Sequence, residues 1–249
     1  MESAEKGFFI FRFDTLAPAF VVPRIQSTLE VLGTPSPELK SFGRPFRNLG
    51  ELLVKLQQMN RTTFNVVGQE YEFDCGKVRS KDLDFLLVGF RGKRNFVWDQ
   101  WAAPFIGSRN FVMGYVVDSE YDFWQNAYDP IQYEAKHRPF NHLPMKSNGL
   151  PYPLEKMIID TSQNPGRRTL RNGYHEAVAS VMWLGETFWH LTGADRKEIE
   201  RSGWLHVAHP LAEVIRIQAA EEYFRTPDSA SGEIQKKLRS VLFPRLVTV

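Results

Sequence analysis

The sequence predicts an α+β fold, in which a central, mostly antiparallel sheet has helices packed at the N-terminus and C-terminus of the chain. Regular helical spacing of apolar residues lies mainly before residue 60 and after residue 190. The middle of the chain holds short β-branched and aromatic runs separated by Gly-containing turns. That order is typical of an antiparallel meander and not of alternating strands and helices. A chain of 249 residues that is 43% hydrophobic can also bury a core without a disulfide or a metal.

The amino-terminal part predicts one strand and two helices. Residues 8–13 form an aromatic run that is typical of a strand. Apolar residues recur at helical spacing over 21–32, where Pro23 fits a first turn. Asn48 is a candidate helix cap, because an apolar stripe follows it over residues 49–59.

The middle of the chain predicts strands and then a long connection. Residues 121–128 predict a brief helix after the last of these strands. Five prolines, Asn148 and Gly149 indicate that residues 129–153 form an ordered surface connection. This connection is the one place for a sub-domain boundary in what we otherwise interpret as a single domain, residues 1–249. The predicted strands are 62–67, 69–73, 83–90, 95–98 and 110–117.

The carboxyl-terminal third predicts further short elements. Residues 173–191 fit a strand or a helix equally well. The other predicted elements are a strand over 157–160, a turn over 163–168, a charged helix over 194–201, strands over 204–207 and 214–217, and a closing helix over 233–243.

Composition excludes several classes of protein. A net charge of +2 is far from that of a dedicated nucleic-acid binder. The one cysteine, Cys75, excludes an internal disulfide. The sequence has no apolar run near the roughly 20 residues that span a bilayer, and its first residues are not those of a secretory signal. We therefore expect a cytoplasmic protein without direct membrane or nucleic-acid contact.

Searches for catalytic patterns favour a protein without enzymatic activity. The sequence has no Gly-x-Ser-x-Gly, no Walker loop and no His-Glu-x-x-His. Its close histidine pairs, 206/209 and 137/142, lack neighbouring ligands, so we predict no metal and no cofactor. One alternative remains, a metal-dependent restriction-type nuclease that uses Asp118, Glu134 and Lys136. The acidic-x-Lys triplet in this set also occurs at 38–40 and 195–197, which weakens the match.

A stronger signal is an acidic and aromatic stretch over residues 118–129. Tyr and Trp are rigid anchors at interfaces, and neighbouring acids complement a basic partner. The alternative interpretation is a core helix with a solvated acidic edge. The predicted partner-binding residues are Asp118, Glu120, Tyr121, Asp122, Trp124, Tyr128 and Asp129.

Three segments resemble a known family. Residues 160–168 read Asp-Thr-Ser-Gln-Asn-Pro-Gly-Arg-Arg, residues 173–178 read Gly-Tyr-His-Glu-Ala-Val, and residues 182–189 read Met-Trp-Leu-Gly-Glu-Thr-Phe-Trp. These segments resemble immunity proteins of bacterial polymorphic-toxin systems. Among them, they resemble the type VI secretion immunity protein paired with a restriction-endonuclease-like toxin effector. The resemblance implies an antitoxin that binds a cognate toxin effector, and a non-enzymatic adaptor domain is the further alternative. The sequence sets no oligomeric state.

The residues that carry this resemblance have no catalytic pattern, and we interpret them as structural. The turn predicts a glycine with positive φ at Gly166, and the two arginines after it predict pairing with carboxylates or a helix end. The motif residues are Asn164, Pro165, Gly166, Arg167, Arg168, Trp183 and Gly185.

Overall fold

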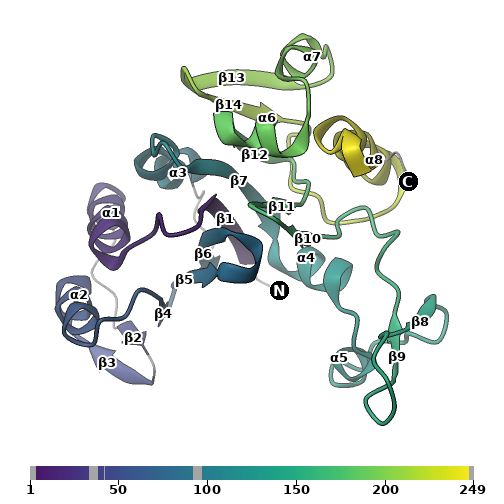
Figure 1. The fold of residues 1–249 in the computed structure, drawn as a ribbon, viewed down its shortest axis with the longest axis horizontal. Coiled ribbons are helices and arrows are strands. Elements are labelled where there is room, and N and C mark those ends of the chain that lie inside the picture. The colour runs from purple at the N-terminus through teal and green to yellow at the C-terminus, as the bar shows by residue number, and fades with distance from the viewer. Residues whose placement is uncertain (1–3, 34–38, 42, 92–96, 247–249) are drawn as a thin grey trace.

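A ten-stranded antiparallel sheet forms the centre of the molecule, which confirms the predicted α+β class (Figure 1). The computed structural model describes residues 4–33, 39–41, 43–91 and 97–246. The strand order is β13-β14-β12-β7-β1-β6-β5-β4-β2-β3. The strands of this sheet are β1 (Ala4–Arg12), β2 (Leu39–Ser41), β3 (Arg44–Phe46), β4 (Phe64–Val67), β5 (Tyr71–Val78), β6 (Leu83–Arg91), β7 (Phe111–Asp118), β12 (Val181–Gly185), β13 (His206–Leu211) and β14 (Val214–Gln218).

Strand β1 lies near the middle of the sheet and is buried on both faces. Its side chains alternate, so Phe9 and Phe11 enter one apolar core while Phe8 and Ile10 enter the other. A strand buried on both faces has no polar face, which explains why its sequence is a continuous apolar run.

Three helices cover the first face of the sheet: α1 (Pro18–Val31), α2 (Leu49–Gln58) and α3 (Trp98–Ile106). The Asn48 side chain accepts a hydrogen bond of 2.9 Å from the backbone N–H of Glu51, which confirms the predicted cap of α2. Helix α1 begins at Pro18, so Pro23 lies inside the helix and not in its first turn as predicted.

The second face carries helices from the later part of the chain. These are α4 (Ser119–Asn126), α6 (Glu186–Thr192), α7 (Arg196–Arg201) and α8 (Ser229–Leu242). Phe188 of α6, Ile199 of α7 and Leu238 of α8 are buried in the second core. The ambiguous region 173–191 contains β11 (Tyr174–Glu176), which pairs with β10 (Thr169–Arg171), and then β12 and α6.

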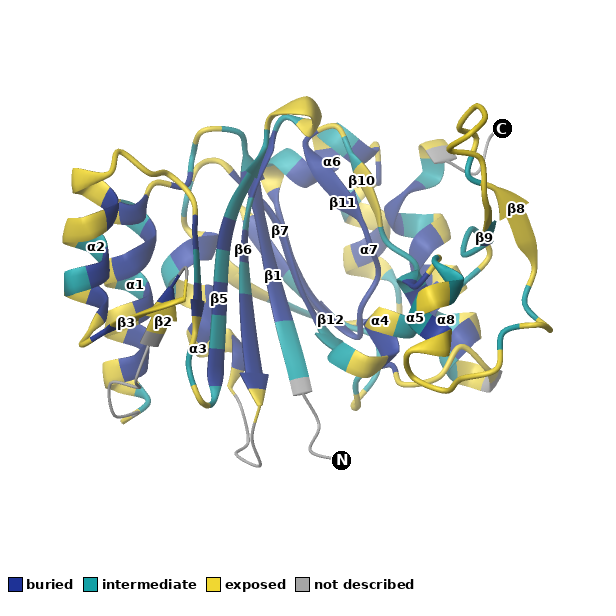
Figure 2. Cartoon of the chain, turned by 90° about the horizontal axis from the view of Figure 1, so that it is seen from below, coloured by how far each residue is buried: buried dark blue, intermediate teal, exposed yellow. Residues whose placement is uncertain are grey.

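A peripheral layer lies at the end of the molecule opposite α1 and α2 (Figure 2). It contains α5 (Pro130–Glu134) and the hairpin of β8 (Met145–Ser147) and β9 (Met157–Ile159). Ala127, Tyr133 and Ile159 form its small apolar cluster. The predicted connection 129–153 therefore contains regular elements, and a boundary within it stays a prediction.

The predicted strand over 95–98 is wrong at its last residue, where helix α3 begins. Residues 95 and 96 lie outside the described part of the chain. The Trp98 indole N–H donates to Glu5 at 2.8 Å, and its ring covers Gly7 so closely that a Cβ there would lie 2.2 Å from it. These two contacts hold the start of α3 on strand β1. Within the described ranges, no helix has the length and apolar composition needed to cross a bilayer.

Gly185, one of the motif residues, is required by a close backbone approach. A Cβ at this position would lie 2.6 Å from the carbonyl oxygen of Phe111 on β7. We expect Gly185→Ala to lower the free energy of unfolding by about 1–3 kcal/mol, because backbone must move to admit the methyl group. Gly203→Ala is the control, since its Cβ would meet nothing within 4 Å. Equal urea midpoints for the two variants would contradict this explanation.

Candidate interaction surface

Helix α4 begins immediately after β7, and Asp118 is its cap. One carboxylate oxygen of Asp118 accepts from the backbone N–H groups of Glu120 at 3.1 Å and Tyr121 at 2.9 Å. The other oxygen lies 3.4 Å from the Arg225 guanidinium. The carboxylate of Asp118 is therefore fully engaged within the chain.

Tyr121 and Asp122 face the interior of the molecule. Tyr121 is 9% exposed and Asp122 is 7% exposed. The Tyr121 hydroxyl donates to Gln235 of α8 at 2.9 Å, and burial raises the pKa of Tyr121 to about 12. Asp122 lies 3.3 Å from Arg168; burial raises its pKa, and that arginine opposes the rise. Both were predicted as partner-binding residues, but this burial removes them from the surface that a partner can reach.

Residues 164–168 run along α4 and hold it by hydrogen bonds. The Asn164 amide donates to the carbonyl oxygen of Gln125 at 2.9 Å. The Gly166 N–H donates to the side chain of Gln125 at 3.0 Å, and the Arg168 N–H donates to that of Asn126 at 2.8 Å. We call residues 164–168 the strap, because they bind the polar side of α4 to the rest of the molecule.

Gly166 does not have the positive φ that the turn predicted. It is required for a different reason, because a Cβ there would lie 2.7 Å from Gln125 Cγ and 2.8 Å from the Tyr121 ring. The neighbouring Pro165 carbonyl accepts from Arg239 of α8 at 3.1 Å. The strap is thus packed between two helices.

A buried carboxylate organises the arginines of this region. Glu176 on β11 is 2% exposed. Its Oε2 accepts from Arg171 at 2.7 Å, and its Oε1 accepts from Arg239 at 2.8 Å and lies 3.7 Å from Arg167. The prediction that the strap's two arginines pair with carboxylates is confirmed, since Arg168 pairs with Asp122.

Trp183 is a core residue, as the structural interpretation expected. It is 1% exposed on β12. Its indole N–H donates to Asp99 at 3.2 Å, and Asp99 in turn accepts from Arg216 at 2.9 Å.

His175 is a buried titratable group next to Glu176. Its Nδ1 lies 2.8 Å from the Tyr115 hydroxyl, and Nε2 has no hydrogen-bond partner among the described residues. Burial, with a smaller contribution from Arg168, lowers the pKa of His175 to about 3. The imidazole is therefore neutral at physiological pH.

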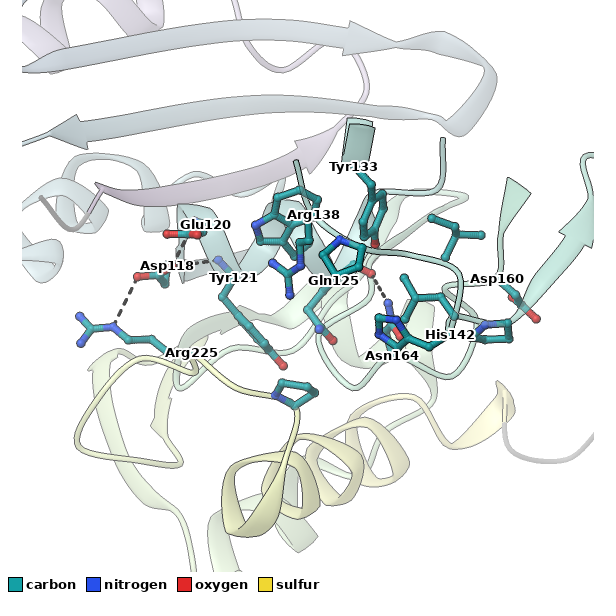
Figure 3. Close-up of a pocket in the computed structure, with 16 residues that line it drawn as sticks. Asp118, Glu120, Tyr121, Gln125, Tyr133, Arg138, His142, Asp160, Asn164 and Arg225 are labelled. Carbon is teal, nitrogen blue, oxygen red and sulfur yellow. Dashed lines mark hydrogen bonds and ion pairs between the residues drawn. The ribbon is translucent and has the colours of Figure 1, made fainter. Parts of the chain in front are cut away.

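A cavity of about 400 Å³ lies beside α4 (Figure 3). Asp118 and Glu120 lie at one end of it, and Asp160 lies at the other. The Arg138 guanidinium stacks 4.3 Å from the ring of Trp124. Three of its charged groups are paired within the chain, Asp118 with Arg225 and Asp160 with Lys146. Its other lining residues include Tyr121, Gln125, Tyr133, Pro139, His142, Leu143, Pro144, Ile159, Asn164, Arg225 and Pro227.

The β8–β9 hairpin exposes large apolar side chains on the outside of the molecule (Figure 2). Residues 145–157, which we call the apolar hairpin, include Tyr152 at 90% exposure and Leu154 at 65%. Exposed apolar side chains gathered in one place mark interaction sites more often than single ones do. The remaining members are Met145 at 38%, Leu150 at 50% and Met157 at 54% exposure.

The loop of the apolar hairpin is ordered by one residue, Asn148. Its backbone N–H donates to Lys156 and its amide donates to Leu154, both at 2.9 Å. Its side-chain oxygen accepts from the N–H groups of Leu150 at 3.1 Å and Lys156 at 3.3 Å. The exposed side chains are therefore presented on a fixed backbone, which lowers the entropy lost on binding.

Two ion pairs fix the base of the apolar hairpin. Lys146 lies 2.7 Å from Asp160, and Lys156 lies 2.6 Å from Asp129. The hydrogen bond from Lys146 lowers the pKa of Asp160 to about 2. Asp129 also accepts from the Ile131 N–H at 3.3 Å at the start of α5.

Of the residues predicted to bind a partner, Glu120 and Tyr128 are exposed, and Asp118, Trp124 and Asp129 are half-buried. Among the described acids of the stretch 118–129, Glu120 alone makes no ion pair. Partner binding by Glu120, Trp124 and Tyr128 stays a prediction.

Sequence reasoning missed the apolar hairpin, although its sequence contains a usable signal. Leu150, Tyr152 and Leu154 alternate with Pro151 and Pro153. Proline cannot donate to a strand ladder, so this segment cannot be a central strand. Three large apolar side chains that alternate with prolines therefore do not fit a sheet core.

The residues of the nuclease alternative do not form a metal centre. Asp118 caps α4, while Glu134 and Lys136 are exposed at and beyond the end of α5. Within the ranges that the structure describes, no three His, Cys, Asp or Glu side chains form a group able to hold a metal ion.

Comparison with known proteins gives a similarity of fold. No protein-family model matches the sequence, and no curated protein sequence matches it. Among solved structures, the fold is similar to that of a Pseudomonas aeruginosa type VI secretion system (T6SS) protein, PA0821, with a TM-score of 0.54 and 13% sequence identity. The similarity covers 97% of this chain and 73% of that chain.

We expect Glu176→Gln to lower the free energy of unfolding by about 3 kcal/mol, because it leaves clustered guanidinium groups without a counter-charge. Glu186→Gln is the control, since Glu186 pairs with Arg196 at the surface and is 54% exposed; it should cost less than about 1 kcal/mol. Urea denaturation of both variants measures this, and equal losses would contradict the role of Glu176.

We also expect His175 to destabilise the protein in acid. The unfolded chain binds a proton at this residue near pH 6.5, whereas the folded chain binds it only near pH 3. Stability therefore falls as pH drops below 6.5, by about 2 kcal/mol between pH 7.5 and pH 5 from this residue. Urea midpoints should fall less with acid in His175→Gln than in the wild type. An unchanged dependence in His175→Gln would contradict the assignment.

Proposed function

We propose that this chain is an immunity protein of a type VI secretion system, which neutralises a toxin effector by stoichiometric contact and has no enzymatic activity of its own. The observation that carries the proposal is the apolar hairpin, in which an ordered loop displays Leu150, Tyr152 and Leu154 to solvent. In this proposal the protein acts in the cytoplasm, where a toxin would reach its target.

The apolar hairpin fits the requirements of tight binding. An inhibitor of a lethal enzyme needs a Kd near nanomolar, about −12 kcal/mol. Buried aromatic and aliphatic anchors in the centre of an interface supply most of such an energy. Tyr152 and Leu154 are the most exposed of these side chains, so they lose the most water-accessible apolar area if a partner covers them.

Charge plays a smaller part in this proposal than the acidic stretch suggested. Asp118, Asp122 and Asp129 are each paired with a cation of the same chain. Within the stretch 118–129, only Glu120 remains unpaired to complement a basic partner, and the chain carries a net charge of +2. We therefore propose that apolar contact by the hairpin provides the affinity, while Glu120 and Tyr128 lie at the rim.

Two independent similarities support the type VI assignment. The strap and the residues around Glu176 carry the textual resemblance to immunity proteins, and the fold is similar to that of a type VI secretion protein. The strap has a structural role, because it hydrogen-bonds Gln125 and Asn126 at the end of α4.

The proposal is tested by measuring binding to the toxin candidate encoded beside this gene, by calorimetry and by protection of toxin-expressing cells. We expect one-to-one binding that weakens by about 100-fold or more in Tyr152→Ser/Leu154→Ser, because two central anchors are lost. The control is Val54→Ser/Met59→Ser. It alters two exposed apolar side chains, 53% and 51% exposed, in α2 and at its C-cap, and α2 lies at the opposite end of the molecule.

Two results would contradict the proposal. One is equal affinity in the hairpin and control variants. The other is plasmid cleavage by the purified protein in Mg²⁺ that disappears in Asp118→Asn or Glu134→Gln, since a nuclease would then be the correct assignment.

A further inference from the structure

A second cavity lies between the second face of the sheet and the β10–β11 hairpin. Its volume is about 520 Å³, which is in the range of small-molecule sites. It is separate from the apolar hairpin, and Tyr128 is the one residue that it shares with the proposed interface. Its lining comes from β1, β5, β6, the end of α4 and the β10–β11 hairpin, and consists of Phe8, Val78, Phe85, Asn126, Tyr128, Thr161, Arg168, Thr169, Leu170 and His175.

The walls of this second cavity are apolar and rigid. The Phe8 ring stacks on Tyr115 with centroids 5.0 Å apart. Phe85 lies against the backbone of β5, where a Cβ on Gly76 would be 2.3 Å from its ring. Leu170 on β10 is 43% exposed and closes the other side. Such walls favour a flat aromatic or aliphatic body.

The only charged residue among those that line the cavity is Arg168. Its guanidinium stacks 4.8 Å from the Phe8 ring, and its side chain is 34% exposed. Asp122 pairs with one of its nitrogens. The other N–H groups of Arg168 supply the positive charge that a ligand in the cavity can use.

We propose that this cavity binds a small amphipathic carboxylate, an aromatic or fatty acid whose apolar body lies between Phe8, Phe85 and Leu170. The carboxylate accepts hydrogen bonds from Arg168, whose planar guanidinium matches a carboxylate in geometry. The hydroxyl groups of Thr161 and Thr169 lie at the same cavity and offer further donors.

Calorimetry with 2-naphthoate, and with the neutral 2-naphthalenemethanol of the same shape, tests the proposal. We expect one naphthoate per chain, bound about tenfold or more tightly than the alcohol, because a charge-assisted hydrogen bond is lost in the alcohol. Leu170→Glu should abolish naphthoate binding by placing a negative charge at the cavity. Leu211→Glu is the control, since Leu211 is 38% exposed on the distant strand β13.

Each other outcome overturns the proposal. The outcomes are absence of naphthoate binding, equal binding of acid and alcohol, or equal binding by folded Leu170→Glu and Leu211→Glu. The comparison of acid with alcohol uses the wild-type chain, so it decides the question even if Leu170→Glu fails to fold.

Discussion

The buried carboxylate of Glu176 is the constraint on which the rest of the second face depends. Three guanidinium groups, from Arg167, Arg171 and Arg239, surround it. A carboxylate that has left water is stable only when its partners are in place. This requirement fixes α8, the β10–β11 hairpin and the strap relative to one another, because each of them supplies one of these arginines. The strap and Glu176 lie in segments that resemble immunity proteins. These segments therefore form part of an internal frame that holds the strap, the β10–β11 hairpin and α8 together.

This frame divides the residues of α4 and of the peripheral layer into those that are engaged within the chain and those that face solvent. The strap holds Gln125 and Asn126 of α4, so the side chains of these two residues are engaged within the chain. Asp129 and Asp160 hold the lysines at the base of the apolar hairpin. Polar groups thus fix the backbone, and the hairpin is left to display apolar side chains on it. A surface of this kind is suited to contact with another macromolecule.

The sequence predicts well those features that depend on local pattern. The apolar run of β1 and the capped stripe of α2 follow from periodicity and capping alone. Helix α3 is an exception. The buried residues Trp98, Trp101, Ala102, Phe105 and Ile106 recur at helical spacing, but the run over 95–98 favours a strand by residue type and overlaps the first turn of the helix. Among the site residues, Tyr121 and Asp122 lie in a helix, as predicted. Which side of that helix faces the interior depends on contacts with residues far away in the sequence, Gln235 and Arg168. Sequence spacing carries no information about such long-range contacts.

Hydrogen–deuterium exchange of the free chain and of its complex with the toxin effector is the most direct test of the central claim. If the chain acts by occupying the effector's surface with the apolar hairpin, amides of residues 145–159 become protected in the complex, while those of α1 and α2 do not change. Protection confined to other elements, or no protection by a saturating effector, would contradict the account.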